Sequence, residues 1–179
     1  MYVVALAVIV FAFLLLEARR AARHERGLFA RGAIEPVGDV YAVMRIAYPG
    51  AFLTMLAEGF LRQVPAPLLL ASGTVLFALA KALKWWAILS LGSAWTFRVL
   101  VVPGAPLVQS GPYRYLRHPN YVAVAGELVA VALLTGARVT GPIATTAFAA
   151  LMLRRIAVEN RALDAILRRE NLESEDLRI

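Results

Sequence analysis

The sequence contains no cysteine and only two histidines, His24 and His118. The absence of cysteine excludes disulfide bonds, thiolate nucleophiles and cysteine-based metal sites. Two isolated histidines also argue against a histidine-rich metal centre, so no metal is expected. The 179 residues contain no Gly-x-Gly-x-x-Gly motif, no internal repeat and no low-complexity segment.

Charged residues are also few, and apolar residues take their place. Only 17% of the residues are charged and 60% are hydrophobic, whereas a soluble domain is about 45–50% apolar. The mean hydropathy is +0.68. This composition predicts a single membrane domain over residues 1–179. The net charge of +7 is then explained by basic loops on one side of a membrane, and no nucleic-acid partner is expected.

Five apolar segments predict an all-α, polytopic membrane protein with about five transmembrane helices. They are Tyr2–Leu16, Val40–Leu61, Pro65 to Leu91, Asn120–Leu134 and Thr140–Leu153. No basic residue precedes the first segment, so it is expected to be a retained span and not a signal peptide. After the fifth segment, the spacing of Ile156, Leu163, Ile166 and Leu167 predicts a C-terminal amphipathic helix that leaves the membrane.

The distribution of basic residues predicts the orientation. With the N-terminus outside, the cytoplasmic stretches are 17–39, 81–118 and 154–179, and they hold 16 of the 19 basic residues. Arg62 and Arg138 remain outside, and Arg45 lies within a span. The positive-inside rule therefore predicts a cytoplasmic C-terminus and a cytoplasmic active site.

A polar cluster precedes the fourth apolar segment, where Pro119 is expected in the first turn of a helix. Arginines of this cluster can bind a carboxylate, and its tyrosines offer aromatic faces to a cation or an adenine ring. Glu159 and Asn160, at the start of the C-terminal helix, lie at the same predicted depth. A cytoplasmic pocket with these groups would suit an amino-acid zwitterion beside a cation, as in S-adenosylmethionine.

Three further charges are candidate substrate contacts: Arg45, Arg98 and Glu127. A carboxylate at bilayer depth is costly, so Glu127 either meets an amine or cation of the substrate or bonds to Arg45 or a neighbouring hydroxyl. Arg98 is either a headgroup anchor or a lid residue. Glu58 lies about 20 Å from Arg45 along a helix and is expected outside the site.

Arg117-His118-Pro119-Asn120-Tyr121 resembles the Arg-His-Pro-x-Tyr motif of the isoprenylcysteine carboxyl methyltransferase family of membrane enzymes. The preceding Gly111–Tyr115 also matches, and Arg155-Ile156-x-x-Glu159-Asn160-x-x-Leu163 resembles the second family motif. The resemblance covers about residues 85–163. The segment from His24 to Glu35 is similar to a bacterial branch, some of whose members O-methylate alkylpyrone-type lipids. Ala123 stands where the family often has Gly, and Asn160 replaces a second Glu.

The resemblance implies an S-adenosylmethionine-dependent methyltransferase of the bacterial inner membrane. The cofactor-binding part would be about residues 95–170, and the predicted cofactor contacts are Tyr113, Arg117, His118, Tyr121, Glu159 and Asn160. Arg155 would lie near the lipid acceptor, so Arg155 and His118 are the predicted catalytic residues. Whether His118 acts as a base or only positions the cofactor stays open.

The predicted reaction is O-methylation of a lipophilic small molecule, either an isoprenylcysteine-like carboxylate or an alkylpyrone or phenol-type lipid. Membrane lipids are the other expected partners. Three alternatives stay open: a phospholipid N-methyltransferase, an NADPH-dependent membrane reductase of related fold, and a membrane interaction protein without turnover. The sequence does not predict the oligomeric state.

Overall fold

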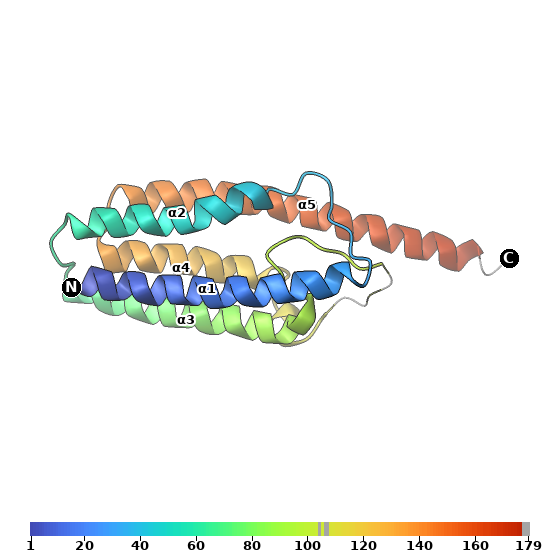
Figure 1. Ribbon diagram of the computed structural model, residues 1–179, viewed down its shortest axis with the longest axis horizontal. Helices are drawn as coiled ribbons and strands as arrows, with labels where there is room; N and C mark the ends of the chain where they lie inside the picture. The colour runs from blue at the N-terminus through green and yellow to red at the C-terminus, as the bar shows by residue number, and fades with distance from the viewer. Residues whose placement is uncertain (104, 106–107, 177–179) are drawn as a thin grey trace.

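The computed structural model describes residues 1–103, 105 and 108–176, and describes the side chains of the last helix only up to residue 162. Five α-helices make up the bundle in Figure 1. They are α1 (Tyr2–Phe29), α2 (Tyr41–Phe60), α3 (Pro67–Leu91), α4 (Pro119–Thr135) and α5 (Thr140–Asp176). Two short 3₁₀ turns, Gly92–Ala94 and Gly111–Arg114, lie between α3 and α4. The fold is therefore all-α, as the apolar segments predict.

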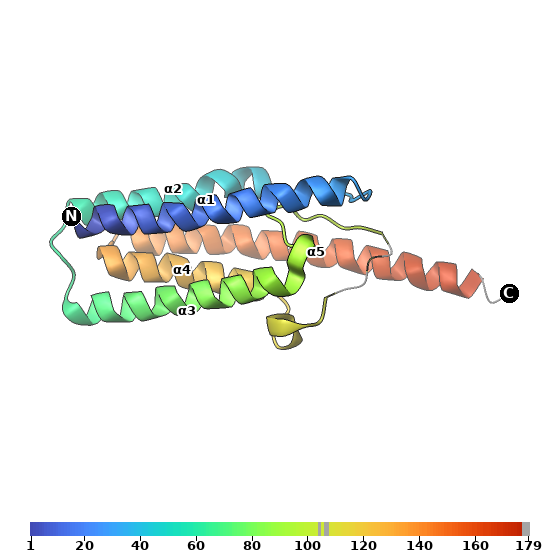
Figure 2. The same ribbon diagram turned by 60° about the horizontal axis from the view of Figure 1, so that its bottom comes forward.

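The helices run alternately up and down along a common axis (Figures 1 and 2). The N-terminus and the connections α2–α3 and α4–α5 lie together at one end of the bundle. The two longer connections, residues 30–40 and 92–118, lie at the opposite end, where α5 continues beyond the other helices. We call the end with the longer connections the loop end and the other the N-terminal end.

Helix α4 is the centre of the bundle, since it packs against α2, α3 and α5. Its inner face and that of α2 form the main hydrophobic core, in which Phe52, Met55, Leu128 and Val131 are almost fully buried. Large apolar side chains elsewhere face outward, as Leu53, Leu79 and Leu153 do. Such a surface is suited to a lipid environment.

Three helical stretches are long and apolar enough to cross a membrane: Tyr2–Phe29, Pro67–Ala94 and Thr140–Ala162. Helix α4 is apolar but shorter, and α2 carries Arg45 near its start and Pro49 within it. The helical membrane architecture is thus confirmed. The count of five spans and the orientation stay predictions.

Two boundaries differ from the sequence prediction. The first apolar segment ends at Leu16, but α1 continues to Phe29 because Glu17–Arg26 contains only residues that helices tolerate well. Helix α5 likewise does not end at Leu153 but runs on as the predicted C-terminal helix. Leu163, Ile166 and Leu167, on which the amphipathic prediction depends, lie outside the described side chains.

The loop end is held together by contacts between distant segments. Ile34 and Val101 form an antiparallel β-bridge, and Nδ1 of His24 lies 2.8 Å from the carbonyl oxygen of Trp95. Gly111 has φ +61°, and a Cβ there would lie 1.9 Å from Oγ of Ser90. Only glycine can therefore occupy this position, which fixes the following 3₁₀ turn against α3.

Candidate cofactor and acceptor site

The loop end brings the two sequence motifs together through Tyr121, in the first turn of α4. Its hydroxyl donates a hydrogen bond to Oε2 of Glu159 at 3.0 Å and accepts one from Nε of Arg155 at 2.9 Å. Arg155 and Glu159 are one turn apart on α5 and so share a face. The motifs, which are more than thirty residues apart in the chain, therefore form one cluster.

Arg155 is 6% exposed and is fixed from three sides. Besides Tyr121, it donates to Oδ1 of Asp39 at 3.3 Å and to the carbonyl oxygen of Phe97. Asp39 in turn accepts hydrogen bonds from the backbone N–H groups of Tyr41 and Val99. A guanidinium has five N–H donors, so two remain for a ligand. The arrangement gives Arg155 a single orientation.

His118 is the N-cap residue of α4, and Pro119 follows it at the first helical position, as predicted. Its ring contacts the second motif through both nitrogens: Nε2 lies 3.3 Å from Oδ1 of Asn160, and Nδ1 lies 3.6 Å from Oε2 of Glu159. Burial and the carboxylate of Glu159 raise the pKa of Tyr113, in the preceding 3₁₀ turn. The phenol of Tyr113 therefore stays protonated at neutral pH and can donate a hydrogen bond.

A cavity of about 510 Å³ lies beside this cluster, which we call the polar cavity. Such a volume lies within the range of small-molecule sites. One wall is apolar and comes from α3 and residues 95–102, with Leu91, Trp95, Val99 and Leu100. The other wall holds every predicted cofactor contact: Tyr113, Arg117, His118, Tyr121, Glu159 and Asn160. The structure thus brings the whole predicted set together.

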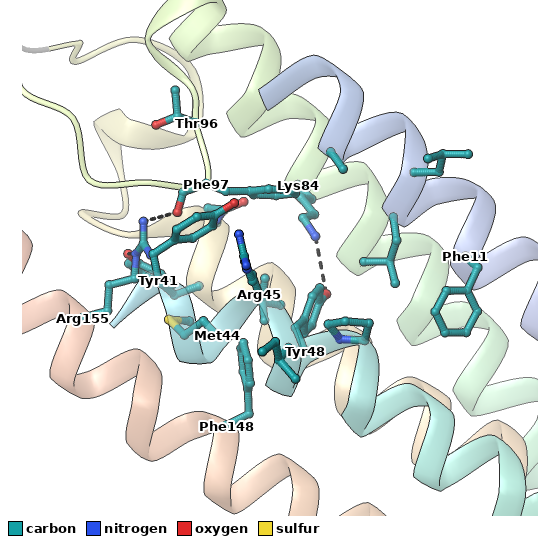
Figure 3. Close-up of a pocket in the computed structure, with 18 residues that line it drawn as sticks. Phe11, Tyr41, Met44, Arg45, Tyr48, Lys84, Thr96, Phe97, Phe148 and Arg155 are labelled. Atoms are coloured by element: carbon teal, nitrogen blue, oxygen red, sulfur yellow. Dashed lines mark hydrogen bonds between the residues drawn. The ribbon is translucent and has the colours of Figure 1, made fainter. Parts of the chain in front are cut away.

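A second cavity, of about 530 Å³, lies deeper between the helices, and we call it the apolar cavity. Most of its wall comes from α1 and α2, with Phe148 of α5 opposite (Figure 3). Leu15 and Ile46 at its rim are 50% and 69% exposed, so the cavity opens sideways between α1 and α2. A lipophilic molecule could enter from the bilayer without crossing water.

The two cavities share a wall made of Thr96, Asn120, Tyr121 and Arg155. Oδ1 of Asn120 is buried there with no hydrogen-bond partner among the described residues. A buried polar atom without a partner is costly, so this oxygen is an available acceptor for a bound ligand. The shared wall is where a molecule in one cavity would meet a molecule in the other.

Of the predicted substrate contacts, Arg45 lines the apolar cavity, and its side chain stands between Tyr41 and Lys84 in Figure 3. It has no carboxylate within 4 Å among the described residues. Arg98 lines the polar cavity instead. It pairs with Glu35 at 2.8 Å and lies 3.6 Å from Glu25, which ties residues 95–102 to the last turns of α1 and to the chain after it.

Glu127 lines neither cavity and is only 1% exposed. The expectation that it might bond to Arg45 is wrong: its carboxylate contacts Lys81 at 3.1 Å and Lys84 at 3.3 Å. Tyr48 of α2 also donates a hydrogen bond to it, so the alternative of a neighbouring hydroxyl is confirmed. Glu127 thus belongs to the helix interior behind the apolar cavity and is not brought together with Arg45 and Arg98.

The same two lysines also contact Glu17 of α1, at 2.8 Å from Lys81 and 2.7 Å from Lys84. Two cations and two carboxylates thus form a neutral cluster that joins α1, α3 and α4. The sequence assigns Lys81 and Lys84 to a cytoplasmic stretch, and the structure adds that both are buried within α3. Their three-residue spacing on one helix face was the available signal.

Residues 73–165 match the isoprenylcysteine carboxyl methyltransferase (ICMT) family, which is more than half of the chain. The chain belongs to this family. It is 34% identical over 144 residues to the uncharacterized protein YpbQ of Bacillus subtilis, covering 80% of this chain and 85% of that protein. An uncharacterized protein of Haemophilus influenzae is 25% identical over 142 residues, covering 79% and 83%. No solved structure matches the chain.

Members of the ICMT family are membrane methyltransferases that use S-adenosylmethionine. The residues of the polar cavity match the chemical groups of that cofactor. Glu159 can accept a hydrogen bond from its ammonium group, and Arg117 can bind its carboxylate. The apolar wall can receive its adenine ring. The free oxygen of Asn120 adds an acceptor at the shared wall. Asn120 is the variable residue of the first ICMT motif, so the sequence pattern gave no reason to select it.

Proposed function

We propose that this ICMT family member transfers a methyl group from S-adenosylmethionine to an oxygen of an anionic, lipophilic acceptor. The observation that carries the proposal is the shared wall of the two cavities. A polar cavity at the loop end suits a water-soluble donor, and an apolar cavity that opens between α1 and α2 suits a molecule from the bilayer. Transfer requires the two molecules to meet, and among the described residues only Thr96, Asn120, Tyr121 and Arg155 border both cavities.

Bound S-adenosylmethionine would supply an electrophilic methyl group on a sulfonium. The protein needs to align the acceptor oxygen and exclude water, and such positioning can lower a barrier by about 7–11 kcal/mol. In this proposal Glu159, Asn160 and His118 hold the amino-acid part of the cofactor. Arg155, already fixed by Asp39 and Tyr121, directs its remaining N–H groups at the acceptor.

The charges of the apolar cavity favour an anionic acceptor. Lys84 and Arg155 are both paired with carboxylates, so Arg45 is the cation of this wall without a described partner. Arg45 is exposed at the edge of this cavity, and an uncompensated cation attracts a carboxylate or an ionised enol or phenol and repels an ammonium group. Arg45 therefore supports O-methylation over N-methylation of a phospholipid amine.

An acceptor that enters as an anion needs no general base. His118 lines the polar cavity but not the apolar one, and both of its ring nitrogens face the second motif. Of the two roles left open by the sequence, the positioning of the cofactor is the one that this geometry supports. Arg155 remains the proposed catalytic residue on the acceptor side.

The proposal is tested with purified protein in lipid nanodiscs, methyl-labelled S-adenosylmethionine and a lipid extract. Label should enter the organic phase with the wild type and not with Glu159→Gln. Mild base should release the label from a methyl ester but not from a methyl ether or a methylamine, and mass spectrometry separates the last two. Label found only on phospholipid amines would contradict O-methylation. Binding of NADPH in place of S-adenosylmethionine would indicate the reductase alternative.

A further inference from the structure

A third cavity lies at the N-terminal end of the bundle, far from the site described above. Its volume is about 790 Å³, and its wall comes from residues 62–66, the start of α3, the end of α4 and the first turns of α5. Gly136, at the end of α4, is fifteen residues from Tyr121, which corresponds to about 20 Å along the helix. The cavity is therefore separate from the proposed methyl-transfer site.

The charges at this end are few, and two of them line this cavity. Arg62 and Arg138 are the two basic side chains that the sequence places on the outer side of the membrane, and both belong to the wall of this cavity. The one carboxylate nearby is Glu58. It accepts hydrogen bonds from the backbone N–H groups of Val139 and Thr140 and pairs with Arg62 at 2.7 Å. Glu58 thus compensates Arg62 and the start of α5.

Arg138, by contrast, has no carboxylate within 4 Å among the described residues and is exposed. Helix α3 also begins at this cavity, so its positive end points towards it, whereas Glu58 already occupies the start of α5. The side-chain hydroxyls of Thr145 and Thr146 complete the polar part of the wall. The cavity therefore offers an uncompensated positive charge and hydrogen-bond donors.

The rest of the wall is apolar and faces outward. Leu69 is 37% exposed and Val129 is 40% exposed, and Leu133 lies between them in the wall. These residues belong to helices α3 and α4 on the side that would contact lipid chains. Polar donors at the end of a bundle beside an apolar outward surface match a molecule with an anionic head and a hydrocarbon tail.

The connections α2–α3 and α4–α5 approach each other closely at this cavity. Gly136 ends α4 in the left-handed conformation with φ +63°, and a Cβ at this position would lie 3.2 Å from Cγ of Pro65. A Cβ at Gly141 would lie 2.8 Å from Cβ of Ala132. The close approach of Gly136 to Pro65 places the segment with Arg62 beside the segment with Arg138.

We infer that this cavity binds the phosphate headgroup of an anionic phospholipid, with Arg138 as the principal contact and Arg62 as the second. The occupant is a membrane lipid and not the methyl acceptor, since the cavity does not communicate with the polar or apolar cavity through any shared residue. A bound lipid would hold together the ends of α3, α4 and α5, and would fix the bundle from the end opposite the reaction.

The test is native mass spectrometry of protein released from nanodiscs of phosphatidylcholine with or without phosphatidylglycerol. The wild type should retain one phosphatidylglycerol in preference to phosphatidylcholine. Arg138→Gln should lower the apparent affinity for phosphatidylglycerol about tenfold, the loss expected for one charge-assisted hydrogen bond. The double variant Arg62→Gln/Arg138→Gln should abolish the preference. Arg23→Gln, an exposed arginine at the loop end, is the matched control and should bind as the wild type does.

Equal retention of phosphatidylglycerol by Arg138→Gln and the wild type would overturn the inference. A second experiment adds inorganic phosphate as a competitor of phosphatidylglycerol. Displacement of the lipid by phosphate at a similar concentration would show that the site binds free anions, and would also overturn the inference. Circular dichroism checks that each variant is folded, and Arg138→Gln removes no described contact. Methyl transfer in phosphatidylcholine nanodiscs should be the same for Arg138→Gln and the wild type, which separates this test from that of the proposed function.

Discussion

Nε of Arg155 donates a hydrogen bond to the hydroxyl of Tyr121 at 2.9 Å, and this contact joins α5 to α4 between the two cavities. The same hydroxyl donates to Glu159, so one oxygen atom connects a residue of the acceptor side to a residue of the cofactor side. Disturbing this oxygen should therefore affect both substrates of the proposed reaction.

Tyr121→Phe keeps the ring and removes only that oxygen. We expect kcat/KM to fall about tenfold or more, because Arg155 loses one of its three described partners and Glu159 loses a donor. Initial rates with labelled S-adenosylmethionine measure the effect. The thermal unfolding midpoint serves as the control, since a fall in rate caused by misfolding would appear there. Unchanged kinetics would show that the contact has no part in turnover.

Arg45→Leu should raise KM for an anionic acceptor about tenfold or more and leave the affinity for S-adenosylmethionine unchanged. The reason is that Arg45 lines the apolar cavity and not the polar one. Arg45→Lys keeps the charge and should recover much of the loss. Arg45→Leu should also increase the rate of methylation of an amine-bearing lipid relative to that of an anionic lipid. Such a change would directly support selection of the acceptor by the charge of Arg45. An acceptor KM that is the same in all three proteins would refute it.

Lys84→Met should destabilise the protein by about 3–5 kcal/mol, the usual cost of leaving one buried charge uncompensated, because Lys81 then faces two carboxylates. Lys84 contacts both Glu17 and Glu127 and is 1% exposed. The double variant Lys84→Met/Glu127→Leu removes one charge of each sign and should regain most of the stability. Reversible unfolding in detergent followed by circular dichroism measures both. A double variant less stable than the single one would contradict a neutral, paired cluster.

Gly111→Ala should lower the affinity for S-adenosylmethionine about tenfold. The new Cβ would collide with Ser90, and the left-handed backbone adds strain of about 1–2 kcal/mol. The turn that carries Tyr113 would then move away from the polar cavity. Gly50→Ala is the matched control, because a Cβ at Gly50 meets no atom within 4 Å. Isothermal titration calorimetry compares the two, and equal affinities would show that the position of the turn does not matter.

Much of the fold could be predicted because apolar runs and helix lengths depend on local sequence. The starts of α4 and α5 follow from Pro119 and Thr140, and the grouping of the polar residues at one end follows from the alternating direction of the helices. The convergence of Tyr121 with Glu159 could be anticipated for the same reason. These features need only the order and the length of the helices.

The buried cluster of Glu17, Lys81, Lys84 and Glu127 could not be predicted in this way. Its formation depends on how α1, α3 and α4 are rotated about their axes, and hydropathy does not fix that rotation. Charged residues near the end of an apolar run are ordinarily assigned to the membrane surface. The four charges compensate one another only after the helices pack. From the sequence, Glu17, Lys81 and Lys84 belong to cytoplasmic stretches, and Glu127 lies at bilayer depth with Arg45 as its candidate ionic partner.

The shared wall was also invisible in the sequence. Thr96 belongs to this wall, and Asp39 and Phe97 hold Arg155 in it. All three come from two irregular segments, which the bridge between Ile34 and Val101 joins. No periodicity describes such segments. The motif residues could be selected, but the boundary between the two cavities required the structure.

The most direct measurement of the central claim is the transfer of label from S-adenosylmethionine to the lipid fraction by the protein in nanodiscs. The account predicts a labelled, base-labile ester or a base-stable ether in the wild type, and its loss in both Glu159→Gln and Tyr121→Phe/Arg155→Leu. A folded wild type that binds no S-adenosylmethionine and leaves every lipid of the extract unlabelled would contradict the account.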